Sequence, residues 1–460
     1  MRHKALVLVV GVALIARLVT SLIRITHGLV PVPFVGPTPW ADYNVYVSEL
    51  HFVAQGYLPY RDFGFSYMPL FLYALLPFYI LLGTYGPSLT IVLTDALTAG
   101  LIYLITLRRL ETKFALAAGL SYALLPFALY NEGYLWLSSQ PMTLFAILSL
   151  YLLLEERPYQ AFVALAVSVL FKQETIVLLP VFFAWQLRTS FAKALRGTGV
   201  FMAMVLAASV PFLITAADNY LYAVSYTLVK LGPLKPEVVS ALPTGITSIP
   251  NKLTCANSII PGQFTGQVCS AANLLSLSWV VSQPLAYRVV ASFQGLLVVL
   301  APAFVLLLGI SLYSARRADN FLQLASAASV VSILVVFGFF VHGVLAYYFV
   351  PVYALAISAS TSRTSAGVAV AGSMLSFLVP EGVFQTFLPI GILFALVIIE
   401  DHRLSKRGVS ADPSHLDTPR KRIIQRGEAH VKFGQTFARD QPKAWPSRVP
   451  IKRSHCGGSL

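Results

Sequence analysis

The sequence is poor in charged residues and in cysteine. Asp, Glu, Lys and Arg make up only 11% of its 460 residues, whereas soluble domains carry about 25%. The 3 cysteines form no Cys/His cluster with the spacing of a zinc site. No Asp-x-Asp pair, which enzymes use to bind a nucleotide sugar through a metal, occurs at Asp42. These absences argue against a soluble enzyme and give no support to a dedicated metal site.

Hydrophobic residues make up 57% of the chain. They occur in blocks of roughly 16–24 residues, long enough to cross a bilayer core of about 30 Å as helix. We therefore expect an all-α integral membrane protein with about 12 transmembrane helices. The first segment, Ala5 to Leu22, is interpreted as a retained signal anchor. The expected spans are 5–23, 88–107, 114–130, 140–154, 159–172, 174–188, 198–216, 289–313, 320–341, 344–361, 365–380 and 384–400.

The apolar stretch 67–82 is short and contains Pro69 and Pro77. We interpret it as a membrane-surface or re-entrant helix that does not cross the bilayer. With the N-terminus in the cytoplasm, the basic turns, including Arg108 to Lys113, then all lie on the cytoplasmic side, as the positive-inside rule requires. Two long loops, 24–87 and 217–288, are left on the outer side.

Residues 1–400 are thus expected to form one membrane domain. Residues 401–460 hold 13 Lys and Arg against 5 Asp and Glu and few apolar residues. This composition predicts a disordered cytoplasmic tail, and its charge is typical of a segment beside anionic lipid rather than of nucleic-acid binding. In the second outer loop, Cys255 and Cys269 are compatible either with a disulfide or with two free thiols.

Polar chemistry is concentrated in the first outer loop. This loop carries the acids Asp42, Glu49 and Asp62 among many Tyr and Phe residues. A carboxylate at the membrane surface, below aromatic side chains, can act as general base for a sugar hydroxyl. For Asp42 and Asp62 the alternative is an ordinary solvated loop acid.

The pattern from Asp42 to Gln55 predicts a short amphipathic helix. In that helix Val45, Leu50 and Phe52 are expected to face lipid. The following residues, Gly56 to Tyr60, predict a turn.

An acid shortly after the first span is followed by an aromatic-rich helix and by the motif Gly56-Tyr57-Leu58-Pro59-Tyr60-Arg61-Asp62-Phe63. This order resembles the GT-C superfamily of multi-spanning glycosyltransferases, which use polyprenyl-phosphate-linked sugars. The resemblance covers roughly residues 5–400 in topology and 12–75 in motif. It implies a mannosyltransferase-like hexosyltransferase with Asp42 as catalytic base. Asp62 is a second catalytic candidate, and Tyr60 and Arg61 are candidate substrate-binding residues.

Three further positions agree with this resemblance. Glu132, in a turn expected on the outer face, corresponds to a second acid of similar enzymes. Lys172 resembles a lysine that holds the lipid phosphate as a point charge, although pairing with Glu174 or snorkelling to the interface is an alternative. His342 and Tyr347 resemble a late His and Tyr pattern, in which Ala346 replaces the expected Arg. A capping or core role is the alternative for His342.

Arg17 and Asp95 are charges inside predicted spans. Such charges cost about 2.5–3.5 kcal/mol on insertion scales and usually face the bundle interior. A structural Arg17–Asp95 pair is one interpretation. Contact of Arg17 with the donor phosphate is the other.

The resemblance implies a definite reaction. A polyprenyl-phosphate sugar is the donor, and a glycan, lipid or protein hydroxyl is the acceptor at the outer face. Membrane lipid is a further partner, nucleic acid is not, and a divalent metal such as Mg²⁺ or Mn²⁺ is a possible cofactor with no dedicated site. The alternatives are a 12-span secondary transporter and a non-catalytic protein that binds lipid-linked sugars.

Overall fold

The computed structural model describes residues 2–28, residues 42–225 except four single positions, residues 349–359 and a few single residues between 308 and 371. For Asp42 it describes the backbone alone. The chain divides into the units Met1–Gly408 and Val409–Leu460, and every described residue belongs to the first. Apart from residues 349–359 and the single positions, the spans expected after residue 288, most of the second outer loop and the basic tail lie outside the described residues.

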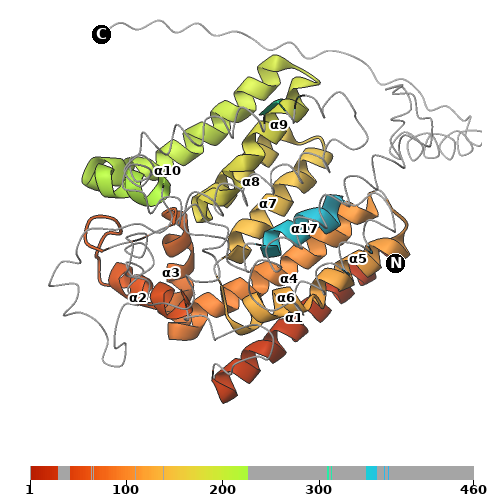
Figure 1. Ribbon diagram of the computed structural model, residues 1–460, viewed down its shortest axis with the longest axis horizontal. Coiled ribbons are helices and arrows are strands. Elements are labelled where there is room, and N and C mark those ends of the chain that lie inside the picture. Colours follow the sequence, from red (N-terminus) through yellow and green to blue (C-terminus); the bar gives the residue numbers. More distant parts are fainter. Residues whose placement is uncertain are drawn as a thin grey trace, which may run out of the picture. The chain divides into compact units, whose positions relative to one another are not determined.

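The described residues are almost entirely helical and contain no β-strand, in agreement with the expected all-α class (Figure 1). The elements are α1 (Arg2–His27), α2 (Asp42–Ala54), α3 (Leu70–Leu82), the 3-10 helix η1 (Gly83–Tyr85), α4 (Gly86–Leu107), α5 (Thr112–Ala123), α6 (Pro126–Ala128), the π-helix η2 (Leu129–Tyr134), α7 (Ser139–Leu154), α8 (Pro158–Phe171), the 3-10 helix η3 (Gln173–Val177), α9 (Leu178–Leu187), α10 (Phe191–Ser225) and α17 (Phe349–Ala359).

Several of these helices have the length and composition of membrane spans. Within the described residues, four segments qualify: His3–His27, Leu70–Leu107, Thr112–Tyr134 and Phe191–Ala217. Their outer surfaces carry large apolar side chains that are exposed in the isolated chain, such as Ile15 on α1 and Ile214 on α10. Contiguous apolar surface of this kind requires lipid or another apolar partner. These helices indicate a helical membrane protein.

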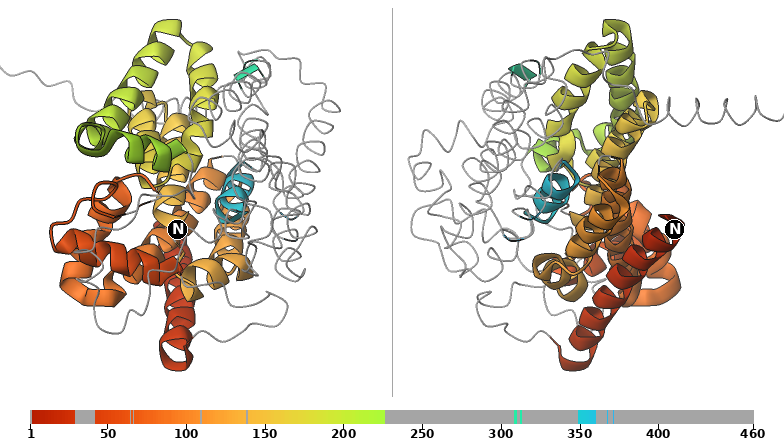
Figure 2. Two further views of the ribbon diagram at one scale, coloured as in Figure 1. Left: turned by 60° about the vertical axis from the view of Figure 1, so that its left-hand side comes forward. Right: turned by 90° about the vertical axis from the view of Figure 1, so that its right-hand side faces the viewer.

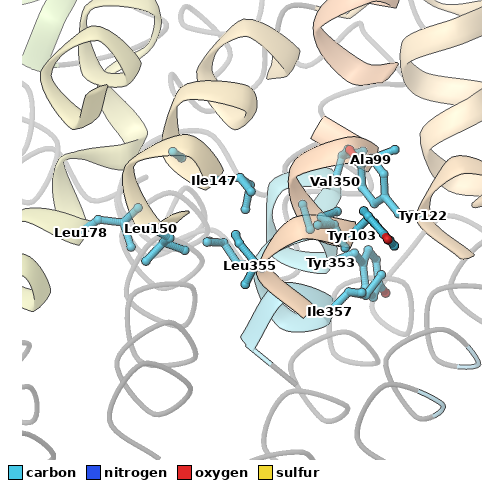
Figure 3. Packing of buried hydrophobic residues seen from close by; sticks show 14 of the residues in the cluster. Ala99, Tyr103, Tyr122, Ile147, Leu150, Leu178, Val350, Tyr353, Leu355 and Ile357 are labelled. Carbon is cyan, nitrogen blue, oxygen red and sulfur yellow. The ribbon is translucent and has the colours of Figure 1, made fainter. Parts of the chain in front are cut away.

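Helix α4 occupies the centre of the described helices. It packs against α1, α3, α5 and α7, and α7 in turn packs against α8. Helix α17, although distant in sequence, lies against α4 and α7. Figure 2 shows it beside α4 and away from α1. In the core, Val350 and Tyr353 of α17 lie beside Tyr103 and Tyr122 (Figure 3).

The apolar face of α2 does not face lipid as expected. The helix itself is present at Asp42–Ala54, but Val45, Leu50 and Phe52 are buried. The reason is that the following loop folds back over α2, so that the ring of Phe63 lies 5.4 Å from that of Phe52. Helix α3 covers α2 as well.

The stretch expected as a surface or re-entrant helix forms α3, which continues through Pro77. Its 13 residues are fewer than the roughly 20 needed for a full span. Gly83, with a φ of 61°, ends α3 in a backbone conformation that favours glycine. Helix η1 then leads directly into α4, so α3 and α4 form one continuous apolar segment.

Candidate functional site

The start of α2, where Asp42 lies, is fixed to two other parts of the chain. The ring of Tyr43, the next residue, lies 4.8 Å from that of Trp136. The Tyr43 hydroxyl donates a hydrogen bond to the Thr84 carbonyl and accepts one of 3.1 Å from the Ser88 amide. Burial raises the pKa of Tyr43 above its usual value. Position 42 is thereby held beside the α3–α4 junction and the segment that follows η2.

Arg24 completes this arrangement, and sequence reasoning did not single it out. Its guanidinium lies 3.8 Å from the Trp136 ring centroid and 5.2 Å from that of Tyr43. It also donates hydrogen bonds of 2.9 and 2.5 Å to the carbonyls of Tyr134 and Leu135. An arginine in the last turn of an apolar helix, followed by an aromatic-rich loop, is the signal that could have identified it.

Replacing Arg24 by alanine is expected to lower the free energy of unfolding by about 2–4 kcal/mol, because charge-assisted hydrogen bonds and cation–π contacts are lost together. Lysine at this position should recover only part of the loss, since it lacks the planar fork of arginine. Unfolding by SDS titration in mixed micelles measures the effect. The exposed Thr26→Ala in the same turn serves as control, and an Arg24→Ala protein as stable as that control would contradict the proposed anchoring.

Helix η2 approaches α1 too closely for a side chain at Gly133. A Cβ atom there would lie 2.1 Å from Thr20 Oγ1. The Gly133 carbonyl accepts a 2.8 Å hydrogen bond from Ser21 Oγ, and the same Oγ accepts a 2.9 Å bond from Trp136 Nε1. This pair of bonds fixes the Trp136 side chain against α1. The backbone of Trp136 has a left-handed conformation, with a φ of 57°.

Residues 56–67, which contain the motif and are called the motif loop, are organised around Tyr60. Like Trp136, Tyr60 has a positive φ, at 67°. Its buried ring lies 4.9 Å from that of Tyr220. Its hydroxyl donates a 2.5 Å hydrogen bond to the Tyr67 carbonyl. Burial raises the pKa of Tyr60 well above its usual value. A non-glycine residue held in this conformation is uncommon and often marks a functional or strained position.

Asp62 stabilises the same loop. Its Oδ2 accepts a 2.8 Å hydrogen bond from the Leu58 amide. Both of its carboxylate oxygens accept bonds from Arg61, at 2.9 and 2.7 Å. The Asp62 side chain is buried, whereas that of Arg61 is 44% exposed. These contacts give Asp62 a role in the turn, and they leave Arg61 at the surface of the loop.

Lys172 lies inside the protein at the end of α8, against the motif loop. Its Nζ is 2.6 Å from Glu174 Oε1, and both side chains are buried. The same Nζ lies 5.4 Å from the ring centroid of Tyr67, whose hydroxyl is 3.3 Å from that of Tyr46 on α2. The Lys172–Glu174 pair, considered as an alternative from sequence, is therefore present. We call Tyr46, Tyr67, Lys172 and Glu174 the loop–lysine cluster.

Arg17 is engaged within the helices. It donates from Nε to Asp95 and from its terminal nitrogens to the carbonyls of Ala13, Tyr122 and Ala123. The side chains of Arg17 and Asp95 are completely buried. The structural pair expected as one alternative from sequence is thus formed.

Glu132 lies in the π-helix η2 rather than in a simple turn, and it is completely buried. The turn interpretation was wrong because the chain after Pro126 stays helical and packs against α1. π-Helical turns occur frequently at functional sites.

The remaining candidate residues from the sequence stay predictions. His342, Tyr347 and the pair Cys255 and Cys269 lie outside the described residues. Among the residues that are described, no three His, Cys, Asp or Glu side chains gather as a metal ion would require.

No family model matches the chain, and none of the curated proteins matches it.

Proposed function

We propose that the protein is a membrane glycosyltransferase that moves a sugar from a polyprenyl-phosphate donor to an acceptor hydroxyl. In this proposal the chain has a GT-C-like fold of about 12 spans, both termini are cytoplasmic and the site faces the outer side. The observation that carries the proposal is the loop–lysine cluster. It joins the motif loop and α2, which begins at Asp42, to a buried lysine.

The reaction is a single displacement. Asp42 removes the proton from the acceptor hydroxyl, whose oxygen attacks the anomeric carbon of the sugar. The bond from that carbon to the phosphate oxygen breaks, and polyprenyl phosphate leaves with the electron pair. One displacement inverts the anomeric configuration. The protein needs only a base and a group that stabilises the leaving charge, because the phosphate ester is already activated.

Lys172 is suited to stabilise the leaving phosphate. Its burial places a positive charge in a low-dielectric environment, where its interaction with an anion is strong. Glu174, 2.6 Å from the Lys172 Nζ, holds this group in place before the donor binds. Arg61, exposed at the loop surface, offers a second cation for the phosphate.

The direct test is an assay of the purified protein with a panel of labelled polyprenyl-phosphate sugars and a hydroxyl acceptor. Mass spectrometry is expected to detect a glycosylated acceptor and free polyprenyl phosphate in equal amounts. Parallel proteoliposomes are tested for uptake of the free sugars. Uptake without release of polyprenyl phosphate would replace the proposal with a transporter, and binding without release would indicate a non-catalytic binding protein.

A further inference from the structure

Gln140 is the second residue of α7, and its side chain is completely buried. Neither its Oε1 nor its Nε2 has a hydrogen-bond partner in the part of the chain that the structure describes. Buried polar groups are almost always hydrogen-bonded, and those that are not call for an explanation. A buried amide with both ends unmatched is therefore either a cost to the fold or a group kept for a ligand.

The position of Gln140 connects the two parts of the candidate site. Four residues before it, Trp136 packs against Tyr43, the neighbour of Asp42. Two residues after it, the Met142 carbonyl accepts a 2.7 Å hydrogen bond from Ser168 Oγ. The carbonyl of Ser168 accepts in turn from the Lys172 amide, at 3.1 Å. The residues that flank Gln140 in sequence thus contact both the neighbour of the proposed base and the helix that ends at the proposed phosphate-binding lysine.

The chemistry of the amide indicates what it binds. It offers one acceptor and two donors and carries no charge. Neighbouring hydroxyls on a sugar ring, which also donate and accept, match this set, whereas a phosphate is bound better by a cation.

We propose that Gln140 binds the sugar hydroxyls of the donor and takes part in selecting the sugar. This inference rests on the proposed function, because it takes the ligand of the site to be a polyprenyl-phosphate sugar. The amide stays unmatched until the sugar arrives, so a donor with correctly placed hydroxyls gains hydrogen bonds that the bare lipid phosphate does not make.

The test is the variant Gln140→Leu, which keeps the side-chain volume and removes both polar ends. Binding of citronellyl-phosphate mannose, glucose and galactose, and of citronellyl phosphate without sugar, is measured in detergent micelles. The affinity for the preferred sugar ligand is expected to fall about 10- to 100-fold, as for the loss of one or two hydrogen bonds. The affinity for bare citronellyl phosphate and the thermal stability of the variant should not fall.

Ser149→Ala is the matched control on the same helix. Ser149 is also buried, but its Oγ already donates to the Ala146 carbonyl, at 2.7 Å. This variant should bind every ligand with wild-type affinity.

Three results would overturn the inference. Unchanged affinity of Gln140→Leu for the sugar ligands would indicate that water or the protein satisfies the amide. Equal loss for the sugar ligands and for bare citronellyl phosphate would indicate that the sugar is not recognised. A wild-type protein that binds none of the sugar ligands would exclude the site.

The proposed enzymatic function and the proposed sugar site can be disproved independently of each other. If the wild-type protein binds a sugar ligand through Gln140 but transfers no sugar, the proposed enzymatic function is wrong and the sugar site is retained. Conversely, if the wild-type protein transfers sugar and Gln140→Leu transfers it equally well, the enzymatic function is retained and the proposed sugar site is wrong.

Discussion

Replacing Asp42 by asparagine is expected to reduce sugar transfer by about 10²- to 10⁴-fold, the usual contribution of a general base. Asparagine has the same shape and cannot accept the proton of the acceptor. It is also as favourable as aspartate at the beginning of a helix, so α2 should form normally. The loss is expected in kcat, with little change in donor affinity, because the phosphate and the sugar are held by other residues.

The measurement is kcat and KM of the purified variant with the preferred donor, together with its yield in membranes. Glu111→Gln is the control, since Glu111 is exposed and pairs only with Lys113, at 3.3 Å, as far as the described contacts show. It should remain fully active. Wild-type activity of Asp42→Asn would remove Asp42 from the mechanism. Loss of kcat in a stable Asp62→Asn variant instead would transfer the role of base to Asp62.

Replacing Arg17 by methionine is expected to destabilise the protein by about 3–5 kcal/mol. Removal of one partner from a buried ion pair leaves the other charge uncompensated, here Asp95, with the Tyr122 hydroxyl at 2.8 Å as a remaining donor. The variant also loses the bonds from Arg17 to the backbone carbonyls at the end of α5. The free energy of unfolding, measured by SDS titration, should show the whole effect.

The double variant Arg17→Met with Asp95→Leu is the appropriate control. Because it removes both charges, it should be more stable than Arg17→Met alone. Together with the single variant Asp95→Leu it completes a double-mutant cycle, which measures the coupling between the two residues. A single variant with unchanged stability and weakened donor binding would contradict the structural pair. That result would instead support the alternative in which Arg17 contacts the donor phosphate.

The helical class of this protein and the limits of α2 were predictable from its sequence, because both depend on local patterns. Runs of apolar residues specify spans by their length, and the spacing of apolar residues between Asp42 and Gln55 specifies a helix that the structure places at Asp42–Ala54. The pairing of Lys172 with Glu174 could also be predicted from the sequence as one alternative, because only one residue separates them.

Only the tertiary structure decided which side of α2 is covered and which groups surround position 42. Arg24, Trp136 and Tyr43 come from three different segments, so no local pattern brings them together. The burial of Phe52 depends on a loop that folds back over it, and the unmatched amide of Gln140 is recognised only once its surroundings are known. Sequence periodicity determines which residues can be buried, but which partner a buried group contacts depends on the packing of segments that are distant in sequence.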